Sequence, residues 1–235
     1  MQTSFSKINR MKILRTVSME KKKHLKQIWK PGNMLYPVPA VMVSCMEKPE
    51  NSRTGEESGN PDGSAPKNKA NIITVAWAGT VCSDPPMVSI SVRPTRWSHH
   101  IIKESGEFVV NLVTEELTKA CDWCGVRSGR DYDKFRETGL TEYHSELMDT
   151  PAIAESPVNI YCRVKQVLPL GSHDMFLGEV IGVTVDETYL DEGGRFDLDA
   201  TGLIAYSHGQ YFALGRKLGK FGFSVQKQRR RRKSV

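Results

Sequence analysis

Residues 71–98 place the strongest constraint on how this chain can fold. Residues 71–81 are rich in β-branched and small side chains, and the two prolines of Ser83-Asp84-Pro85-Pro86 exclude a helix directly afterwards. From Met87 to Arg93 apolar and polar residues alternate, with Val88, Ile90 and Val92 on one side and Ser89, Ser91 and Arg93 on the other. The stretch therefore predicts a strand, a tight turn and a second strand with one apolar and one polar face.

The rest of the chain repeats short strands divided by turns. Further strands are predicted over residues 40–46, 107–113, 157–168, 175–185, 203–206 and 210–214. Short helices are predicted from Pro94 or Thr95 to Ser105, from a cap at Thr114 toward Cys124, and after Asp131 or Asp133. The chain has no βαβ rhythm, internal repeat or glycine-rich nucleotide motif. An antiparallel barrel is favoured, because closure removes exposed sheet edges.

Charge is distributed unevenly and outlines the predicted domains. Residues 1–30 carry nine Lys/Arg and one Glu, residues 227–235 carry six Lys/Arg, and the rest has a net charge of −8 although the whole chain is +6. We therefore expect a partly flexible basic extension (1–30), one domain (31–215) with a long flexible loop (47–70), and a basic tail (216–235). An acidic domain argues against nucleic-acid binding except through the tails.

Cysteines and targeting features favour a reduced compartment. The five cysteines are an odd number scattered over a chain too long to need disulfides. Cys121-Asp122-Trp123-Cys124 has the CxxC spacing, but no second pair or HxxxH follows, so no metal site is predicted and dithiol chemistry stays an alternative. No apolar run is long enough to span a membrane and no secretory signal is present, so a cytoplasmic location is expected.

The polar end of the central hairpin has the composition of a phosphate site. Ser91, Arg93, Arg96 and Ser98 lie within eight residues, between a strand end and a predicted helix N-terminus. Arginine forks, hydroxyl groups and free helical amides all bind phosphate oxygens, and Lys134 adds a further cation. The alternative interpretation is an ordinary helix start with solvated arginines.

Two other residues are candidates for cofactor contact. Trp77 is flanked by small residues that let a flat ligand approach the backbone, although a tryptophan in a strand is often part of the core. His173 follows a glycine turn between two predicted strands, where a histidine can donate to a cofactor or simply lie exposed.

Taken together, these motifs resemble the flavin reductase-like family of FMN-binding split barrels, and its flavoredoxin branch in particular. The resemblance covers roughly residues 31–215 and depends on the order and spacing of several short motifs. These are Asn71…Thr74-Val75-Ala76-Trp77, Ser83-Asp84-Pro85-Pro86, Ser89-Ile90-Ser91-Val92-Arg93 with Trp97-Ser98, Phe108-Val109-Val110-Asn111-Leu112, Ser128-Gly129…Asp133-Lys134-Phe135, and Gly171-Ser172-His173-Asp174…Gly178-Glu179-Val180. The resemblance implies a mainly β fold with short helices, an antiparallel Greek-key split β-barrel of the FMN-binding type.

The resemblance also implies a role for each candidate residue. FMN ring contacts are implied for Asn71, Thr74, Val75, Ala76, Trp77 and Thr80, and phosphate-end contacts for Ser91, Val92, Arg93, Arg96, Trp97, Ser98 and Lys134. His173 takes the position of the family's catalytic histidine, and Tyr206 that of a late aromatic residue. Ser172 stands where many relatives have Asp, which leaves the hydrogen-bond partner of His173 open.

The implied function is that of an NAD(P)H-dependent flavin oxidoreductase. It would take hydride from NAD(P)H onto FMN and pass electrons to free flavin or another soluble acceptor, as a homodimer. A flavoredoxin-type electron carrier with little NAD(P)H turnover is the first alternative. A non-catalytic β-barrel module that binds nucleic acid or protein through its basic tail is the second.

Overall fold

The computed structural model describes residues 25–48 and 69–225. The chain divides into two units, Met1–Met34 and Leu35–Val235, and all helices and strands described below lie in the second. Most of the predicted N-terminal extension, most of the 47–70 loop and the basic end of the tail after residue 225 lie outside the described residues. No described helix is long and apolar enough to cross a membrane.

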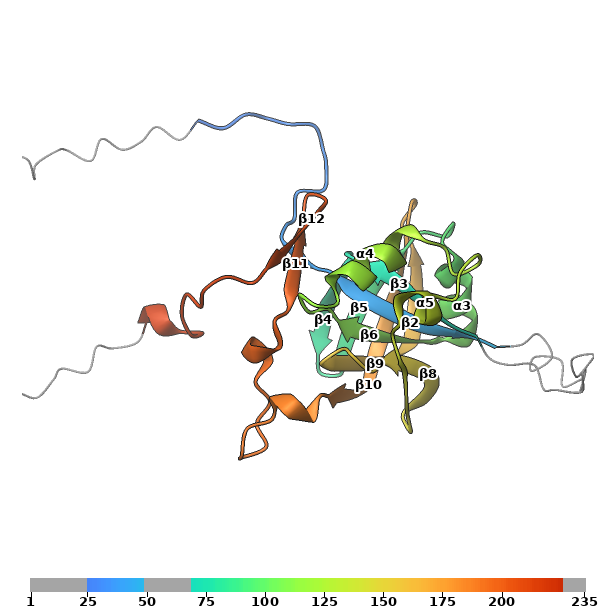
Figure 1. The fold of residues 1–235 in the computed structure, drawn as a ribbon. Coiled ribbons are helices and arrows are strands. Elements are labelled where there is room, and N and C mark those ends of the chain that lie inside the picture. Colours follow the sequence, from blue (N-terminus) through green and yellow to red (C-terminus); the bar gives the residue numbers. More distant parts are fainter. Residues whose placement is uncertain (1–24, 49–68, 226–235) are drawn as a thin grey trace, which may run out of the picture. The chain divides into compact units, whose positions relative to one another are not determined.

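The largest sheet is antiparallel throughout. Among the described residues it has seven strands in the order β3-β2-β6-β9-β10-β5-β4 (Figure 1). Their bounds are β2 Val41–Glu47, β3 Lys69–Val75, β4 Ala78–Ser83, β5 Pro86–Val92, β6 Glu107–Leu112, β9 Val158–Pro169 and β10 Asp174–Val185. A smaller sheet joins β1 (Val38–Pro39), β11 (Ile204–Ser207) and β12 (Gln210–Ala213), and another joins β7 (Glu142–Ser145) and β8 (Met148–Ile153).

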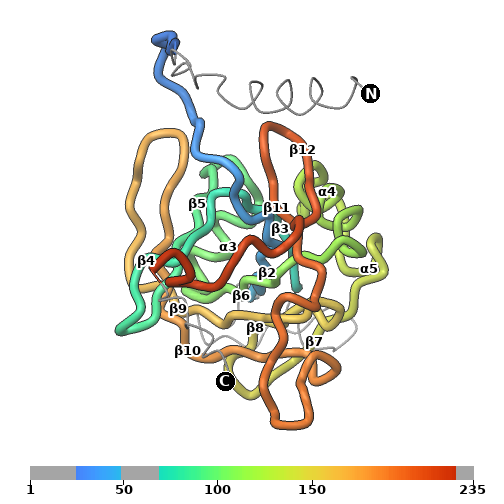
Figure 2. Tube along the Cα trace, turned by 90° about the vertical axis from the view of Figure 1, so that its left-hand side faces the viewer, coloured from blue at the N-terminus to red at the C-terminus, as the bar shows by residue number. Residues whose placement is uncertain are grey.

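Short helices connect the strands. They are α3 (Trp97–Ser105), α4 (Thr118–Val126) and α5 (Lys134–Thr138), with 3₁₀ turns η1 (Glu187–Tyr189), η2 (Leu198–Thr201) and η3 (Phe223–Val225). α4 and α5 pack against β3, whereas α3 packs against β2. In Figure 2 the long β9–β10 hairpin runs beside β5, on the opposite side from α4 and α5. The predicted mainly β, antiparallel fold with short helices is confirmed.

The two edges of the main sheet, β3 and β4, are joined by only Ala76 and Trp77. This crossover closes the sheet into a barrel, and the backbone N–H of Ser91 donates to the Trp77 carbonyl at 2.9 Å across the closing seam. The expectation of one unbroken strand over residues 71–81 was therefore wrong. β3 pairs with β2 and β4 pairs with β5, so the chain must leave one edge and enter the other between them.

The connection from β5 to β6 gives the barrel its Greek-key character. It runs through α3, and in the sheet the strands β10 and β9 lie between β5 and β6. The antiparallel register of β10 on β5 places Asp174 opposite Val92. The first residues of β10 are thereby held at the end of β5, close to the start of α3.

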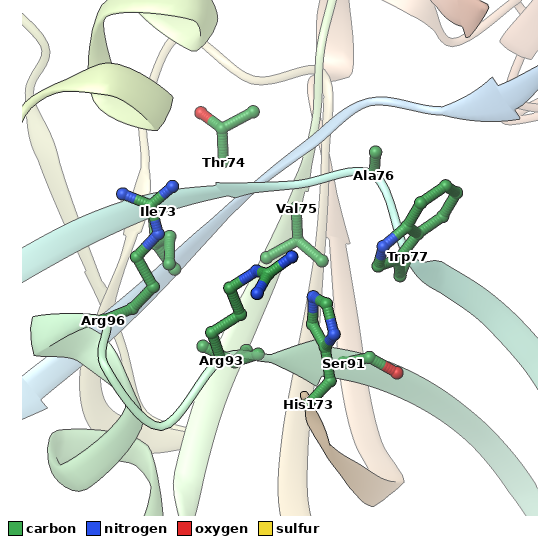
Figure 3. Close-up of a pocket in the computed structure, with 10 residues that line it drawn as sticks. Ile73, Thr74, Val75, Ala76, Trp77, Ser91, Arg93, Arg96 and His173 are labelled. Atoms are coloured by element: carbon green, nitrogen blue, oxygen red, sulfur yellow. The ribbon is translucent and has the colours of Figure 1, made fainter. Parts of the chain in front are cut away.

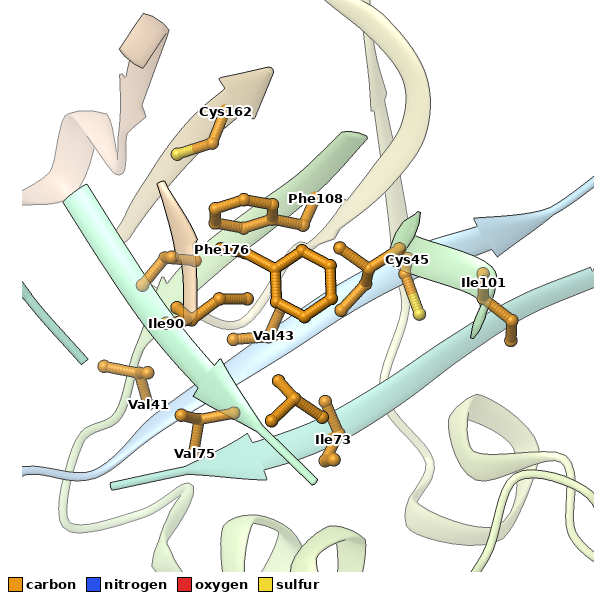
Figure 4. Close-up of a cluster of buried hydrophobic side chains, with 13 residues drawn as sticks. Val41, Val43, Cys45, Ile73, Val75, Ile90, Ile101, Phe108, Cys162 and Phe176 are labelled. Carbon is orange, nitrogen blue, oxygen red and sulfur yellow. The ribbon is translucent and has the colours of Figure 1, made fainter. Parts of the chain in front are cut away.

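The main core fills the inside of this barrel (Figure 4). Phe108 and Phe176 are fully buried there, among β-branched side chains and the Cys45 and Cys162 thiols. Gly178 makes room for the Phe108 ring, because a Cβ at this glycine would lie 2.7 Å from Phe108 Cζ. A second apolar cluster lies under α4, α5 and β11 and includes Met42, Ile72 and Phe135.

The predicted end of α3 and one of the two candidate caps of α5 agree with the structure, whereas the predicted starts of α3 and α4 were misplaced. α3 begins at Trp97 with Arg96 as its N-cap residue, instead of at Pro94 or Thr95. Gly106 and Gly139 follow α3 and α5 in the left-handed conformation, and Asp133 caps α5 by accepting from the Arg136 amide. α4 starts at Thr118 instead of directly after Thr114. The Thr114 hydroxyl does accept a bond from the Leu117 amide, but it closes the turn that precedes the helix.

Candidate functional site

A pocket lies at the barrel seam, where β3, the crossover, the end of β5 and the start of β10 meet. Its empty volume is about 470 Å³, counted with the open solvent at its mouth. The lining residues are Ile73, Thr74, Val75, Ala76, Trp77, Ser91, Val92, Arg93, Arg96 and His173. In Figure 3 the side chains of Arg93 and His173 rise side by side toward β3, with Arg96 on one flank and Trp77 on the other.

Strand register brings His173 to Arg93. Asp174, the first residue of β10, pairs with Val92, the last residue of β5. His173, directly before Asp174, therefore lies opposite Arg93, directly after Val92. The Ser172 hydroxyl is 2.9 Å from His173 Nδ1, which supplies the histidine with a hydrogen-bond partner from its own turn. Partial burial, and then the Arg93 guanidinium, lower the pKa of His173 below its ordinary value. The lowered pKa favours the neutral imidazole, which presents one donor and one acceptor.

Arg93 and Arg96 give one end of the pocket a positive charge. Both side chains are exposed, and among the described residues neither guanidinium has a carboxylate within ion-pairing distance. Arg96 is also the N-cap residue of α3, whose first-turn amides lie at the positive end of the helix. Two unpaired guanidinium groups beside a helix N-terminus are suited to an anion, and phosphate oxygens match their planar geometry.

The other end of the pocket is built from small residues, backbone and an indole ring. Ala76 and Trp77 form the crossover, and the Trp77 side chain is half-buried. β3 is an edge strand at the seam, so part of its backbone faces the pocket without a strand partner. On the far side of β3, the Thr74 hydroxyl donates to the Cys121 carbonyl of α4. A flat ligand with polar ring atoms fits beside such a strand edge.

Nine of the fifteen predicted site residues line the pocket, and the others lie elsewhere. Asn71 and Ser98 are buried and bonded to each other, with Asn71 Nδ2 donating to Ser98 Oγ at 2.8 Å. Lys134 is also buried, and its ammonium donates to the Ile72 and Cys124 carbonyls, each at 2.7 Å. Through these bonds Asn71 of β3 is tied to α3, and Lys134 of α5 is tied to β3 and α4.

The remaining three predicted residues do not line the pocket. Thr80 is exposed on β4. Trp97 packs against the main core and makes an edge contact with the His100 ring at 4.4 Å between centroids. Tyr206 lies on β11, with its ring centroid 6.4 Å from that of Tyr36.

Burial changes the chemistry of Lys134 and of the CxxC cysteines. Desolvation lowers the pKa of Lys134 to about 8, although the nearby Cys124 and Cys45 oppose this effect. Cys121 and Cys124 are free thiols buried in α4, and burial raises their pKa values to about 12 and about 11. Thiols with such pKa values are poor nucleophiles, which argues against dithiol redox chemistry. Within the described residues no group of His, Cys, Asp and Glu could hold a metal ion.

The structure adds site residues that the sequence motifs did not identify. Ile73 lines the pocket, and Tyr36 lies beside Trp77 with 6.1 Å between ring centroids. Tyr36 reaches this position because β1 pairs with β11, a contact between chain segments about 170 residues apart. The only nearby sequence signal that could have pointed to Tyr36 is the Ser207-His208-Gly209 turn. This turn predicts the β11–β12 hairpin, but it gives no information about the pairing of β1 with β11.

The fold and the site define a class of protein: an antiparallel split barrel with an arginine-containing pocket at its seam. A family model described as "Flavin reductase like domain" matches residues 34–215. The chain belongs to this family.

Individual relatives agree with this assignment. An uncharacterized protein of Archaeoglobus fulgidus is 32% identical over 144 residues, which is 61% of this chain and 80% of the relative. The flavoredoxin of Desulfovibrio vulgaris (Miyazaki F) superimposes with a TM-score of 0.70 at 26% identity, over 86% of this chain and 100% of that structure. The flavoredoxin of Methanosarcina acetivorans gives 0.69 at 26% identity with the same coverage.

Proposed function

We propose that this chain binds FMN in the seam pocket and acts as an NAD(P)H-dependent flavin oxidoreductase. One observation carries the proposal: a single pocket of a flavin reductase-like fold contains two arginines without a carboxylate partner, Arg93 and Arg96, together with an open strand edge and Trp77. The spacing suits FMN, with its phosphate toward the arginines and its ring along residues 74–77. Asn71, Ser98 and Lys134 would support these contacts by tying β3 to α3, α4 and α5.

FMN supplies the hydride and electron-transfer chemistry when it is bound, and the protein orients and surrounds it. Arg93 and Arg96 bind the anionic end and fix its direction along β3. His173, oriented by Ser172, offers a hydrogen bond next to the Arg93 guanidinium. In this proposal His173 contacts the cofactor or the nicotinamide amide, and electrons pass to free flavin or another soluble acceptor.

A flavoredoxin-type electron carrier is the second candidate. It is supported by the two flavoredoxins, which are covered over their whole length at 26% identity. Visible absorbance separates the candidates. The purified protein, saturated with FMN, is mixed anaerobically with NADH or NADPH in a stopped-flow instrument. Bleaching within seconds by either nucleotide supports the reductase, slow bleaching by both supports the carrier, and failure to bind FMN contradicts both.

The phosphate assignment has its own test. Arg96→Ala is expected to weaken FMN binding by about 1.5–3 kcal/mol, the usual contribution of a hydrogen bond to a charged group. Arg130→Ala is the matched control, because Arg130 is exposed and pairs with its neighbour Asp131 outside the pocket. Flavin fluorescence titration measures both affinities. Equal affinity in the wild type and Arg96→Ala contradicts the phosphate site.

We also propose that the protein is a homodimer. Apolar side chains in the described part of the C-terminal segment are exposed, namely Leu214, Leu218, Phe221, Phe223 and Val225. Such residues are usually covered in solution, and a second copy is the partner that the family resemblance implies. Light scattering on a sizing column is expected to give about twice the 26.4 kDa chain mass. A monomer mass would overturn the homodimer proposal.

The cytoplasmic location stays a prediction.

A further inference from the structure

A nearly buried pair of polar side chains lies next to the pocket without lining it. His99 Nε2 is 2.9 Å from Asp174 Oδ2, and the two side chains are only 9% and 14% exposed. The His99 ring also lies edge-on against Phe176 of the main core, with 5.3 Å between ring centroids. An ionised carboxylate can only accept a hydrogen bond, so His99 donates from Nε2. Water has little access to this bond, unlike to a surface ion pair.

Backbone hydrogen bonds connect His99 to both arginines of the pocket. The Arg96 amide donates to the Arg93 carbonyl, and the His99 amide donates to the Arg96 carbonyl, both at 2.9 Å. Two consecutive turns therefore lead from the end of β5 into the first turn of α3. A bond that holds the His99 side chain in place also holds the helix N-terminus that carries Arg96.

Asp174 has the corresponding position on the histidine side of the pocket. It directly follows His173 and pairs with Val92 in the sheet. The turn before it is closed by a bond from the Leu170 amide to the His173 carbonyl at 2.9 Å. Side chains of directly paired residues lie on the same face of a sheet, so Asp174 projects on the side of the buried Val92. Its carboxylate meets His99 there.

These links form a closed path around the positive end of the pocket. We call it the pocket frame, and its members are Arg93, Arg96, His99, Asp174 and His173; Figure 3 shows the two arginines and His173. Its other links come from chain connectivity, backbone bonds or strand register. The link between His99 and Asp174 is made by side chains and joins α3 to β10. Without it, a nearly buried carboxylate has to move to find another partner or water.

We propose that His99 and Asp174 are a positioning pair that gives the pocket its preference for a phosphorylated flavin. The pair holds the arginine turn and His173 at one separation, so that a single ligand reaches Arg96 with its phosphate and His173 with its ring. This inference deepens the proposed function and rests on it. Riboflavin has the same ring without the phosphate, so its binding should depend much less on the pair.

The test compares FMN with riboflavin by flavin fluorescence titration of the full chain. The ratio of the riboflavin Kd to the FMN Kd measures what the phosphate adds to binding. His99→Leu removes the hydrogen-bond donor and keeps an apolar side chain of moderate size. It is expected to lower this ratio about tenfold, almost entirely by weakening FMN, because a bond to a charged group is lost from the frame. A general loss of stability would weaken both flavins alike and leave the ratio unchanged.

Two further variants separate positioning from other effects. His99→Gln keeps an amide that can donate to Asp174, so its ratio is expected to lie within about threefold of the wild type. His100→Leu is the matched control, because His100 is the next residue of α3 and its ion-pair partner is Glu47 of β2, at 3.9 Å. An unchanged ratio in His99→Leu, an equal fall in His100→Leu, or a ratio as low in His99→Gln as in His99→Leu would each overturn the positioning role of the hydrogen bond.

A double variant keeps the inference testable if His99→Leu does not fold. Replacing both partners of a buried polar pair by apolar residues avoids an unpaired charge and can be nearly neutral for stability. His99→Leu with Asp174→Leu is therefore expected to unfold at a urea concentration close to that of the wild type, and still to show the lowered ratio. A double variant with the wild-type ratio would show that the pair only satisfies its own buried groups.

Failure of the proposed function can be told apart from failure of this inference. If FMN binds, but the wild type binds riboflavin equally well or the ratio does not respond to His99→Leu, the inference fails and flavin binding stands. If the wild type binds neither flavin, the proposed function fails, and an NMR titration of His173 tests the frame without ligand. Partial burial and the Arg93 charge lower the pKa of His173. His99→Leu should raise this pKa toward its ordinary value because Arg93 is no longer held beside the imidazole, whereas His99→Gln should not. Equal titration in all three proteins would overturn the frame.

Discussion

At the scale of single residues, the site depends on charges that modify one another. Arg93 directly follows β5 and His173 directly precedes β10, and the β5–β10 register makes them neighbours. The consequence is a histidine whose pKa is lowered by partial burial and by the Arg93 charge, which favours its neutral form. Neutrality matters because a neutral imidazole can accept as well as donate a hydrogen bond.

Removing the Arg93 charge should therefore change the titration of His173. Partial burial and Arg93 both lower the pKa of His173, so Arg93→Ala is expected to raise this pKa toward its ordinary value while burial keeps it below. An NMR titration of the imidazole resonances measures the shift. Arg96→Ala serves as the control with the same loss of charge. Equal His173 titration in the wild type and Arg93→Ala would contradict the coupling.

Lys134 allows a pH-dependent prediction. Lys134→Met leaves two buried carbonyls without a donor, at a cost of about 1–3 kcal/mol each. In the folded wild type the pKa of Lys134 is about 8, below the ordinary lysine value of about 10.4. Between about pH 8 and about pH 10.4 this lysine therefore binds more protons in the unfolded chain than in the folded one. The lysine's contribution to stability therefore rises with pH across that window. Urea unfolding at about pH 7 and about pH 10 should show a larger stability difference from wild type at the higher pH; a constant difference contradicts the burial effect.

Sequence could predict the local half of the site but not the distant half. Strand alternation identified Ser91 and Arg93, and the glycine turn identified His173, because these signals lie within a few residues. It could not show that Lys134 would be buried, since its acceptors are carbonyls of Ile72 and Cys124 that arrive through tertiary packing. A lysine next to a helix start looks the same in sequence whether it faces solvent or the interior.

At the scale of elements, close packing between strands sets the shape of the barrel. Gly178 on β10 lies against Phe108 on β6, and the neighbouring β9 shows a register shift at this level. Turn residues predicted the hairpins well. The break between β3 and β4 was missed because Ala76 and Trp77 carry no turn signal, and the break comes from barrel closure. The β7–β8 hairpin was missed because residues 142–153 lack clear alternation.

Two glycines in the same sheet give a matched test of this packing. Gly178→Ala places a Cβ 2.7 Å from the buried Phe108 ring and is expected to lower the free energy of unfolding by about 1–3 kcal/mol. Gly79→Ala on β4 meets nothing within 4 Å and should leave stability unchanged or raise it by up to about 1 kcal/mol. Urea unfolding measures both. Similar values for the two variants would show that Phe108 moves aside freely.

At the scale of the whole molecule, the seam joins the site to barrel closure. β3 has a strand partner on one side only among the described residues, and the pocket lies on its other side. A ligand in the pocket would contact β3, β5 and β10 together. We therefore expect FMN to slow amide hydrogen exchange in residues 73–77 and 91–96, while β6 and β9 change little. Exchange followed by mass spectrometry checks this, and uniform protection along the chain contradicts it.

The open edge of β3 has a consequence for the stability and abundance of the protein in the cell. A cofactor that contacts both sides of the seam would stabilise the closed barrel. Unfolding of the barrel would then release the cofactor, and loss of the cofactor would make unfolding easier. By mass action, free FMN at a hundred times its Kd would add about 2.7 kcal/mol to the free energy of unfolding. The amount of this protein in a cell would then follow the supply of flavin, because chains made during flavin shortage would unfold and be degraded more often.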